Sequence, residues 1–274
     1  NETLSKNFLI YGFGKSGISS LKYLKKKNRC FIFDDDKKKI KNKYKKFFIS
    51  KSKLLNNNFD YIVLSPGINI NRCQLSNYLK KNQKKVITDL DIFYKFNPKI
   101  LTITITGTNG KSTTSKLLYD ILKDHKYDAR LTGNIGNPIL EEKKVTKNTI
   151  FVVEASSYQL AYSKYFKSKF SIIINISPDH LERHNTMKNY ILSKLKCVIN
   201  QNENDIAIIP NNILLRDLLK PKNIKSKIIF INKNKYKHLK KNLSNNNFVN
   251  SANFQNLNFL FELSKYMNLN LKTV

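Results

Sequence analysis

Short runs of apolar and β-branched residues alternate with stretches of helical periodicity along the whole chain. In the first hundred residues, strand-like runs lie at 8–11, 30–33 and 61–64, with a helical pattern at 18–27. In the remainder, they lie at 100–106, 150–153, 170–176, 206–209 and 227–231, with helical patterns at 111–123 and 187–199. Short buried strands separated by helices are typical of a parallel sheet covered on both faces. The sequence therefore predicts an α/β fold.

The pattern resets around Phe96-Asn97-Pro98, which favours a linker at that point. A chain of 274 residues is long enough for two domains, each with its own core. We therefore expect one domain over residues 1–96 and a second over 97–274. Segments rich in Lys and Asn, at 37–46 and 233–247, are predicted to be exposed helices or loops.

The chain is strongly basic, with 50 Lys and Arg against 19 Asp and Glu and a formal charge of +31. Such a balance is typical of nucleic-acid-binding proteins. However, the excess is nearly all Lys, is spread along the chain and rarely alternates with aromatic residues as a base-stacking surface would. Lys, Asn and Ile all have AT-rich codons, so a biased genome explains the charge more simply. Nucleic-acid binding stays an alternative.

Other features bear on the compartment. No apolar run approaches the roughly 20 residues that span a bilayer, and no signal peptide is visible, although the chain begins at Asn1 and a missing beginning could have carried one. The three cysteines, Cys30, Cys73 and Cys197, lie far apart, which disfavours a disulfide scaffold. We expect a cytoplasmic protein with no membrane contact.

A glycine-rich segment, Gly12-Phe-Gly14-Lys15-Ser16-Gly17, lies between the first predicted strand and the first helix. Glycines there permit a tight turn, and the following helix N-terminus attracts a phosphate. Asp34 and Asp35 end the next predicted strand, where an acid can meet a ribose. The pattern favours NAD or another diphosphate, and a turn without a ligand remains the alternative.

A second glycine segment, Thr106-Gly-Thr-Asn-Gly-Lys-Ser-Thr113, follows a predicted strand and opens a helix. Backbone N–H groups in such a turn suit phosphate oxygens, Lys111 would neutralise phosphate charge, and the Ser112 hydroxyl can ligate Mg²⁺. The usual spacing requires a glycine where Ile105 stands, so this phosphate loop is a shortened form.

Two further residues stand at predicted strand ends: Glu154, and His180 after the run at 170–176. The carboxyl ends of parallel strands are where α/β sheets hold ligands. Beside a phosphate loop the two are better interpreted as metal ligands than as structural residues, because Mg²⁺ takes few protein ligands. Mg²⁺ prefers oxygen and seldom binds histidine, so the assignment of His180 rests on a family resemblance carried by further segments.

Lys194 lies on the predicted helix at 187–199, in the middle of its apolar stripe. Lys188 and Lys196 fall on the solvent side of that helix. A lysine directed at a core is costly unless it is paired, neutralised or modified. The alternative is that its stem packs while its amine reaches water.

The phosphate loop resembles that of the Mur ligases and folylpolyglutamate synthetases, which form amide bonds through acyl phosphates. Further segments resemble the Mur ligases that add D-glutamate: 12–17, 65–68 (S-P-G-I), 88–91 (T-D-L-D), 133–136 (G-N-I-G), 154–160 (E-A-S-S-Y-Q-L) and 179–184 (D-H-L-E-R-H). Their order and spacing match across nearly the whole chain. The glycine-rich start and S-P-G-I distinguish it from the branch that adds diaminopimelate or lysine.

The resemblance implies an ATP-dependent ligase that joins D-glutamate to UDP-N-acetylmuramoyl-L-alanine in peptidoglycan precursor synthesis. It implies a Rossmann-like UDP-binding domain, then a P-loop-type α/β ATPase domain. The resemblance further implies that the chain stops before the C-terminal domain that binds D-glutamate, so we expect it to be inactive alone. We also expect a monomer.

The resemblance also implies residue roles. Two Mg²⁺ ions would be held by Ser112, Glu154, His180 and Lys194, with Lys194 carbamylated by CO₂; Lys111, His180 and Lys194 would be catalytic. The implied ATP contacts are Gly107, Thr108, Asn109, Gly110, Lys111, Ser112, Thr113, Asn253 and Asn256. The implied UDP-substrate contacts are Gly14, Lys15, Ser16, Gly17, Asp34, Asp35, Ser65, Asn134 and Ser156.

The sequence departs from the family pattern at two places: Ala252 stands where His is usual, and Asp35 where another polar residue is usual. Three alternatives stay open. These are a sister ligase that adds L-alanine, a basic P-loop protein that binds nucleic acid, and a dehydrogenase using residues 12–17. The dehydrogenase leaves the second loop, Glu154, His180 and Lys194 unexplained.

Overall fold

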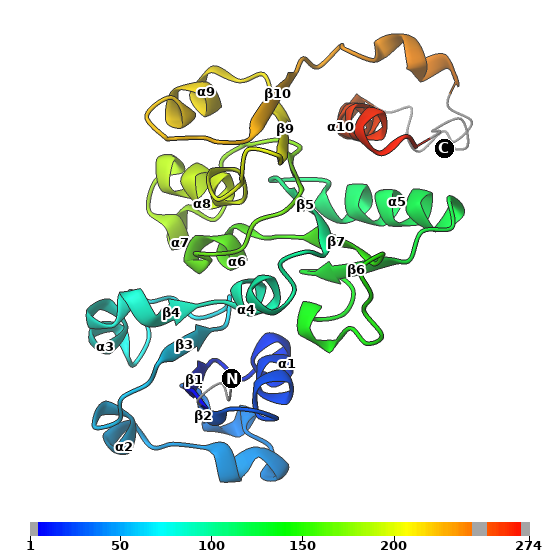
Figure 1. The fold of residues 1–274 in the computed structure, drawn as a ribbon. Coiled ribbons are helices and arrows are strands. Elements are labelled where there is room, and N and C mark those ends of the chain that lie inside the picture. Colours follow the sequence, from blue (N-terminus) through cyan, green and yellow to red (C-terminus); the bar gives the residue numbers. More distant parts are fainter. Residues whose placement is uncertain (1–4, 243–250, 270–274) are drawn as a thin grey trace.

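The computed structural model describes the backbone of residues 5–242 and 251–269, and the side chains of 5–239 and 254–269. Its strands form two parallel sheets, and helix α4 (Asp89–Phe96) lies between them in Figure 1. Because every strand pair is parallel, each connection must cross back over a face of its sheet. The predicted α/β fold is confirmed.

The first sheet has the strand order β2-β1-β3-β4. Its strands are β1 (Asn7–Tyr11), β2 (Arg29–Phe33), β3 (Tyr61–Leu64) and β4 (Val86–Ile87). Its helices are α1 (Lys15–Leu24), α2 (Lys51–Leu55) and α3 (Ser76–Lys81). The three predicted strands are confirmed, whereas α1 begins three residues before the predicted start, directly after Gly14.

The second sheet has the order β10-β9-β8-β5-β7-β6. Its strands are β5 (Leu101–Thr106), β6 (Ala129–Gly133), β7 (Ile150–Glu154), β8 (Phe170–Ile173), β9 (Ile206–Pro210) and β10 (Lys227–Ile231). The helices are α5 (Lys111–Asp124), α6 (Ser157–Tyr162), α7 (Leu181–His184), α8 (Met187–Ile199), α9 (Ile213–Leu219) and α10 (Ser251–Met267).

Two cores cover the faces of the second sheet. Phe151 and Val153 of β7 pack into the core that contains α8, whereas Ile150 and Val152 pack into the core that contains α5 and α10. Alternate residues of a strand point to opposite faces, so β7 is buried on both. Consequently its last residue, Glu154, is also buried, at the carboxyl edge of the sheet.

One strand is shorter than predicted, and the exposed helical segments expected at 37–46 are present. The run at 170–176 is a strand only as far as Ile173. Residues 37–46 hold two short 3₁₀ helices, Lys37–Lys39 and Asn42–Phe47, whose lysines are exposed but whose Tyr44 is buried. Residues 243–247 of the second Lys/Asn-rich segment lie outside the described residues.

Among the described residues, no helix combines the length and apolar character needed to cross a bilayer. Cys30, Cys73 and Cys197 are all free thiols.

Candidate functional site

The loop between β5 and α5 makes a tight turn whose backbone is held from within. Gly110, the residue before α5, has φ +79, a conformation that favours glycine. The Lys111 ammonium donates to the carbonyl of Thr108 at 2.7 Å, and the Thr114 hydroxyl donates to the carbonyl of Gly110 at 2.8 Å. Ser112 and Thr113 are exposed in the first turn of α5. The N-terminus of this 14-residue helix therefore opens to solvent as an anion site would.

Asn175, which follows β8, supports the loop from the neighbouring strand. Its side-chain oxygen accepts from the N–H groups of Thr108 (3.0 Å) and Asn109 (2.9 Å), and its amide donates to the carbonyl of Asn109 (2.7 Å). The same amide donates to Asn256 of α10 at 3.4 Å. A Cβ on Gly110 would lie 2.2 Å from the Asn256 amide nitrogen. Asn256 is thus brought to the loop, as predicted, whereas the side chain of Asn253 lies outside the described residues.

Lys194 is buried beneath the loop. Only 1% of it is exposed, and its ammonium donates to the carbonyl of Gly107 at 2.7 Å. The ammonium also lies 4.7 Å from the ring centre of Tyr190, whose hydroxyl contacts the Thr108 hydroxyl at 3.0 Å. Desolvation, with a smaller effect of the Lys111 charge, lowers the pKa of Lys194 to about 7. The prediction that Lys194 faces the core is confirmed.

The companion prediction for Lys196 is wrong. Lys188 is exposed as expected, but Lys196 is half-buried and its ammonium donates to the carbonyls of Ala161 and Ser163. Burial lowers the pKa of Lys196 as well. A helical wheel places Lys196 off the apolar stripe, but it does not show that the end of α6 and the residue after it cover this side.

Glu154 carries the clearest sign of a missing partner at this edge. It is fully buried, and its Oε1 accepts from the Asn134 amide at 2.9 Å. Its Oε2 has no hydrogen-bond partner among the described residues, and neither has the buried hydroxyl of Thr106 on β5. Buried polar atoms are normally satisfied, and hard oxygen donors are what Mg²⁺ prefers. Glu154 therefore fits a Mg²⁺ ligand.

His180 is far more exposed than Glu154 and Lys194. It has φ +53, its side chain is 45% exposed, and its ring nitrogens lie 3.3 Å from Asp179 and 3.7 Å from Glu182. Its ring lies against that of Tyr158, with centroids 4.9 Å apart. Within the described part of the chain, no three His, Cys, Asp or Glu side chains are arranged to hold a metal. A metal set that includes His180 and Lys194 remains a prediction.

The glycine-rich turn after β1 is shaped by close backbone packing. A Cβ on Gly17 would lie 2.1 Å from the carbonyl oxygen of Gly12, which has φ +91. In contrast, a Cβ on Gly14 would meet nothing within 4 Å, and Lys15 is exposed. Ser16 donates to buried Asp89 at 2.6 Å. The accessible part of the turn is therefore the backbone at Gly14 and Lys15, ahead of the ten-residue helix α1.

Four other residues predicted to contact the UDP-substrate form bonds within the protein. Asp34 accepts from the N–H groups of Phe13 (2.6 Å) and Asp36 (2.9 Å), and the Ser65 hydroxyl donates to the carbonyl of Gly12 (2.5 Å). Exposed Asp35 accepts from the Tyr11 hydroxyl at 2.5 Å. Ser156 caps α6, where its hydroxyl accepts from Gln159 N–H at 3.3 Å. Asp34 and Ser65 thus shape the turn, and Asp35 is the carboxylate that faces outward.

Sequence reasoning missed two supporting groups and one buried histidine. Asn175 and Tyr190 hold the loop, and His184 is 8% exposed with its Nε2 3.0 Å from the Ser157 hydroxyl. Asn175 was open to detection, since it is polar and follows a strand at the ligand edge. Burial, together with nearby cationic groups, lowers the pKa of His184 to about 4.

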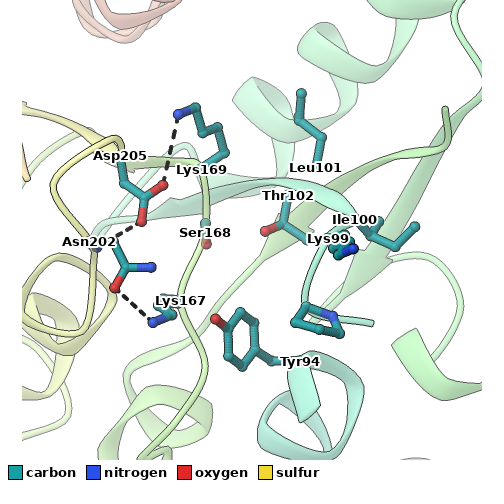
Figure 2. Close-up of a pocket in the computed structure, with 11 residues that line it drawn as sticks. Tyr94, Lys99, Ile100, Leu101, Thr102, Lys167, Ser168, Lys169, Asn202 and Asp205 are labelled. Atoms are coloured by element: carbon teal, nitrogen blue, oxygen red, sulfur yellow. Dashed lines mark hydrogen bonds and ion pairs between the residues drawn. The ribbon is translucent and has the colours of Figure 1, made fainter. Parts of the chain in front are cut away.

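A separate cavity of about 270 Å³ opens at the opposite, amino-terminal edge of the second sheet (Figure 2). Figure 2 shows Lys167 bonded to Asn202 and Lys169 directed at Asp205, at 2.9 and 4.0 Å. These lysines are paired within the protein, and the phosphate loop lies at the other edge. This cavity is not part of the candidate site.

Comparison with known proteins agrees with this geometry. Residues 105–271 match the family described as "Mur ligase middle domain". The chain is 36% identical over 228 residues to a UDP-N-acetylmuramoylalanine–D-glutamate ligase of Caldicellulosiruptor bescii, covering 78% of this chain and 49% of that protein. It is 36% identical over 208 residues to the protein of that name from Rickettsia bellii, covering 74% and 46%. The chain thus spans about half the length of the curated relatives it matches.

A solved structure shares the fold. It is the UDP-N-acetylmuramate:L-alanyl-gamma-D-glutamyl-meso-diaminopimelate ligase from Neisseria meningitides, with a TM-score of 0.51. The alignment covers 82% of this chain and 77% of that one at 12% identity, so the likeness concerns the fold alone.

Proposed function

The chain belongs to the Mur ligase family, through the middle domain that residues 105–271 match, and on that premise we propose that it serves an ATP-dependent ligase of peptidoglycan precursor synthesis. The reaction is the addition of D-glutamate to UDP-N-acetylmuramoyl-L-alanine. The curated relatives named for this reaction support the choice of substrate. One observation carries the proposal: Lys194 and Glu154 are buried ionisable groups beneath and beside a shortened phosphate loop.

In this proposal residues 1–96 form the UDP-binding domain. The diphosphate lies at the N-terminus of α1, against the backbone of Gly14 to Gly17 with Lys15 and Ser16. Asp35 takes the uracil, while Asp34 and Ser65 hold the turn in shape through the bonds described above. The lactyl-alanyl arm extends towards Asn134 and Ser156.

ATP occupies the second domain, residues 97–274. Its phosphates lie on the loop from Gly107 to Thr113. The Lys111 ammonium, which donates to the Thr108 carbonyl in this structure, would exchange that partner for the γ-phosphate. Asn256, beside Gly110, is assigned to the adenosine. Asn253 is predicted for the same role, and its side chain lies outside the described residues. The L-alanyl carboxylate attacks the γ-phosphorus and ADP leaves, giving an acyl phosphate. The amine of D-glutamate then attacks the acyl carbon and displaces phosphate.

Mg²⁺ would supply positive charge beside the transferred phosphate. Ser112 and Glu154 would hold one ion, and Glu154, His180 and Lys194 a second. The lowered pKa of Lys194 leaves much of its amine neutral near pH 7, and a neutral amine can add to CO₂ with loss of one proton. The resulting carbamate would replace a buried cation with an anionic oxygen ligand, the kind of donor that Mg²⁺ prefers.

Titration with the ATP analogue AMP-PNP and Mg²⁺ tests the nucleotide site. Lys111→Met is expected to weaken binding by about tenfold or more, because a phosphate loses its charged partner. Lys116→Met is the matched control on the same helix, since Lys116 is exposed and paired with Asp120. The proposal fails if the two variants bind alike. Failure together with strongly salt-dependent binding of single-stranded DNA would favour the nucleic-acid alternative.

A further inference from the structure

Asp91, on α4 between the two sheets, receives hydrogen bonds from both sides. It is 1% exposed. Its Oδ1 accepts from the Ser163 hydroxyl at 2.8 Å and from the N–H groups of residues 164, 165 and 166 at 2.9, 2.7 and 2.9 Å. Its Oδ2 accepts from the N–H and the hydroxyl of Thr88, at 2.9 and 3.1 Å. One carboxylate thus bonds its own helix through one oxygen and the loop after α6 through the other.

Asp91 accepts more hydrogen bonds than the capping of α4 requires. The capping box at the start of α4 is complete with Thr88 and Oδ2 alone. Oδ1 is wholly committed to the loop between α6 and β8, more than seventy positions later in the chain. An ionised carboxylate is stable in a buried place when its lone pairs are all satisfied, as they are here. Asp91 therefore fixes the loop after α6 to the helix that joins the sheets.

Arg183 makes a contact in the other direction, from the unit built on the second sheet to the unit built on the first sheet. Its Nη2 donates to the carbonyl of Pro66 at 3.0 Å and to that of Ile68, in the segment after β3. Its guanidinium lies over the rings of Tyr158 (5.0 Å) and Tyr162 (5.6 Å), at both ends of α6. The Tyr162 hydroxyl also accepts from Ile70 N–H at 3.4 Å.

The two contacts hold α6 at different places: Arg183 lies on the tyrosines at its two ends, and Asp91 binds the four residues that follow it. Helix α6 begins three residues after Glu154. We propose that Asp91 and Arg183 are positioning residues that clamp α6 between the two units and so fix the distance from the glycine turn at Gly14 to the phosphate loop. This inference rests on the proposed function, because that distance matters to a ligand that reaches both sites.

The clamp should affect the affinity only of ligands that reach both the glycine turn and the phosphate loop. UDP occupies only the turn after β1, and AMP-PNP only the phosphate loop, so neither depends on the angle between the sheets. UDP-N-acetylmuramoyl-L-alanine must satisfy both ends at once, and the contribution of its second end depends on a preset separation. The clamp is therefore measured by the ratio of the Kd of UDP to the Kd of the muramoyl nucleotide.

Asp91→Asn and Arg183→Lys test the clamp. Asn has one acceptor oxygen and an amide that itself donates, so it cannot serve both sets of donors; Lys keeps the charge of Arg183 but loses its planar fork. Thr88→Val is the matched control, since it removes the hydroxyl of the capping box and leaves Oδ1 with its four donors. Each Kd is measured by calorimetry and each melting temperature by circular dichroism.

We expect the ratio to fall about tenfold in Asp91→Asn and Arg183→Lys, with the Kd values of UDP and AMP-PNP within twofold of wild type. Thr88→Val should lower the melting temperature and keep the ratio. A ratio that stays at the wild-type value in both clamp variants, or that falls equally in Thr88→Val, overturns the clamp. Wild-type protein that binds the muramoyl nucleotide no better than UDP overturns the proposed function instead. Should Asp91→Asn fail to fold, Arg183→Lys decides alone.

Discussion

The ammonium of Lys194 donates a hydrogen bond to the carbonyl of Gly107, 2.7 Å away, and so joins α8 to the first residue of the phosphate loop. Burial, with a smaller effect of the Lys111 charge, lowers the pKa of Lys194 to about 7 despite this hydrogen bond. The contact places an amine that is easily neutralised directly beneath the loop where the phosphates of ATP are proposed to lie.

Lys194 should make nucleotide binding sensitive to CO₂. In Mg²⁺, wild-type protein is expected to bind AMP-PNP about tenfold more tightly with bicarbonate than in CO₂-free buffer, because carbamylation supplies an anionic oxygen ligand. Lys194→Met should bind equally in both buffers. Lys188→Met, changed at an exposed site on the same helix, should behave as wild type. A wild-type affinity that ignores bicarbonate would argue against carbamylation.

Glu154→Gln should separate stability from metal binding. The substitution removes a buried negative charge whose Oε2 has no partner among the described residues. Without metal, the free energy of unfolding is therefore expected to rise by about 1–2 kcal/mol. Thermal melts should also show that Mg²⁺ with AMP-PNP stabilises wild type but not Glu154→Gln. Equal stabilisation of the two proteins would remove Glu154 from the metal site.

Gly110→Ala should damage the phosphate loop. Alanine at φ +79 costs about 1–2 kcal/mol, and its Cβ would displace the Asn256 amide, 2.2 Å away. AMP-PNP binding is expected to weaken by at least about tenfold. Gly14→Ala is the control for this site, because a Cβ there meets nothing within 4 Å and it lies in the other turn. Unchanged AMP-PNP binding by a folded Gly110→Ala variant would contradict the assigned loop.

His184 should give the protein a pH-dependent stability. Its pKa is about 4 in the folded state, against about 6.5 when unfolded. The unfolded chain therefore takes up this proton first as pH falls. The contribution of neutral His184 to the free energy of unfolding is therefore complete above pH 6.5. It is lost progressively towards pH 4, by roughly 3 kcal/mol at most.

His184→Gln keeps a hydrogen-bonding group near Ser157 but does not titrate, so its urea-unfolding free energy should fall less between pH 7 and pH 4.5. Parallel pH profiles of the variant and wild type would show that His184 does not titrate on unfolding.

Much of the fold was predictable because buried parallel strands are apolar on both faces. The run at 61–64 coincides with β3, three of whose four residues are buried. The run at 227–231 coincides with the edge strand β10, which is apolar after Lys227. Strands β4 and β6 were not predicted, for two different reasons. Two-residue β4 is too short to show a period, and β6, at the sheet edge, carries half-exposed Arg130.

The site was predictable where geometry follows from position alone. Lys194 faces the core because of its place on a helix, and Glu154 is buried because β7 is central. Other contacts of the site join residues far apart in the chain: Asn175 bonds the phosphate loop, Ser16 bonds Asp89, and Lys196 bonds the end of α6 and the residue after it. Periodicity carries no information about such contacts.

The most direct measurement is a calorimetric titration of the chain with UDP-N-acetylmuramoyl-L-alanine, with UDP-glucose as the matched nucleotide. The account predicts one binding site that prefers the muramoyl nucleotide by about tenfold or more, because its alanyl end adds contacts at the second sheet. Asp35→Ala should weaken both ligands. Equal affinity for the two nucleotides, or binding of neither by a folded chain, would contradict the proposed function.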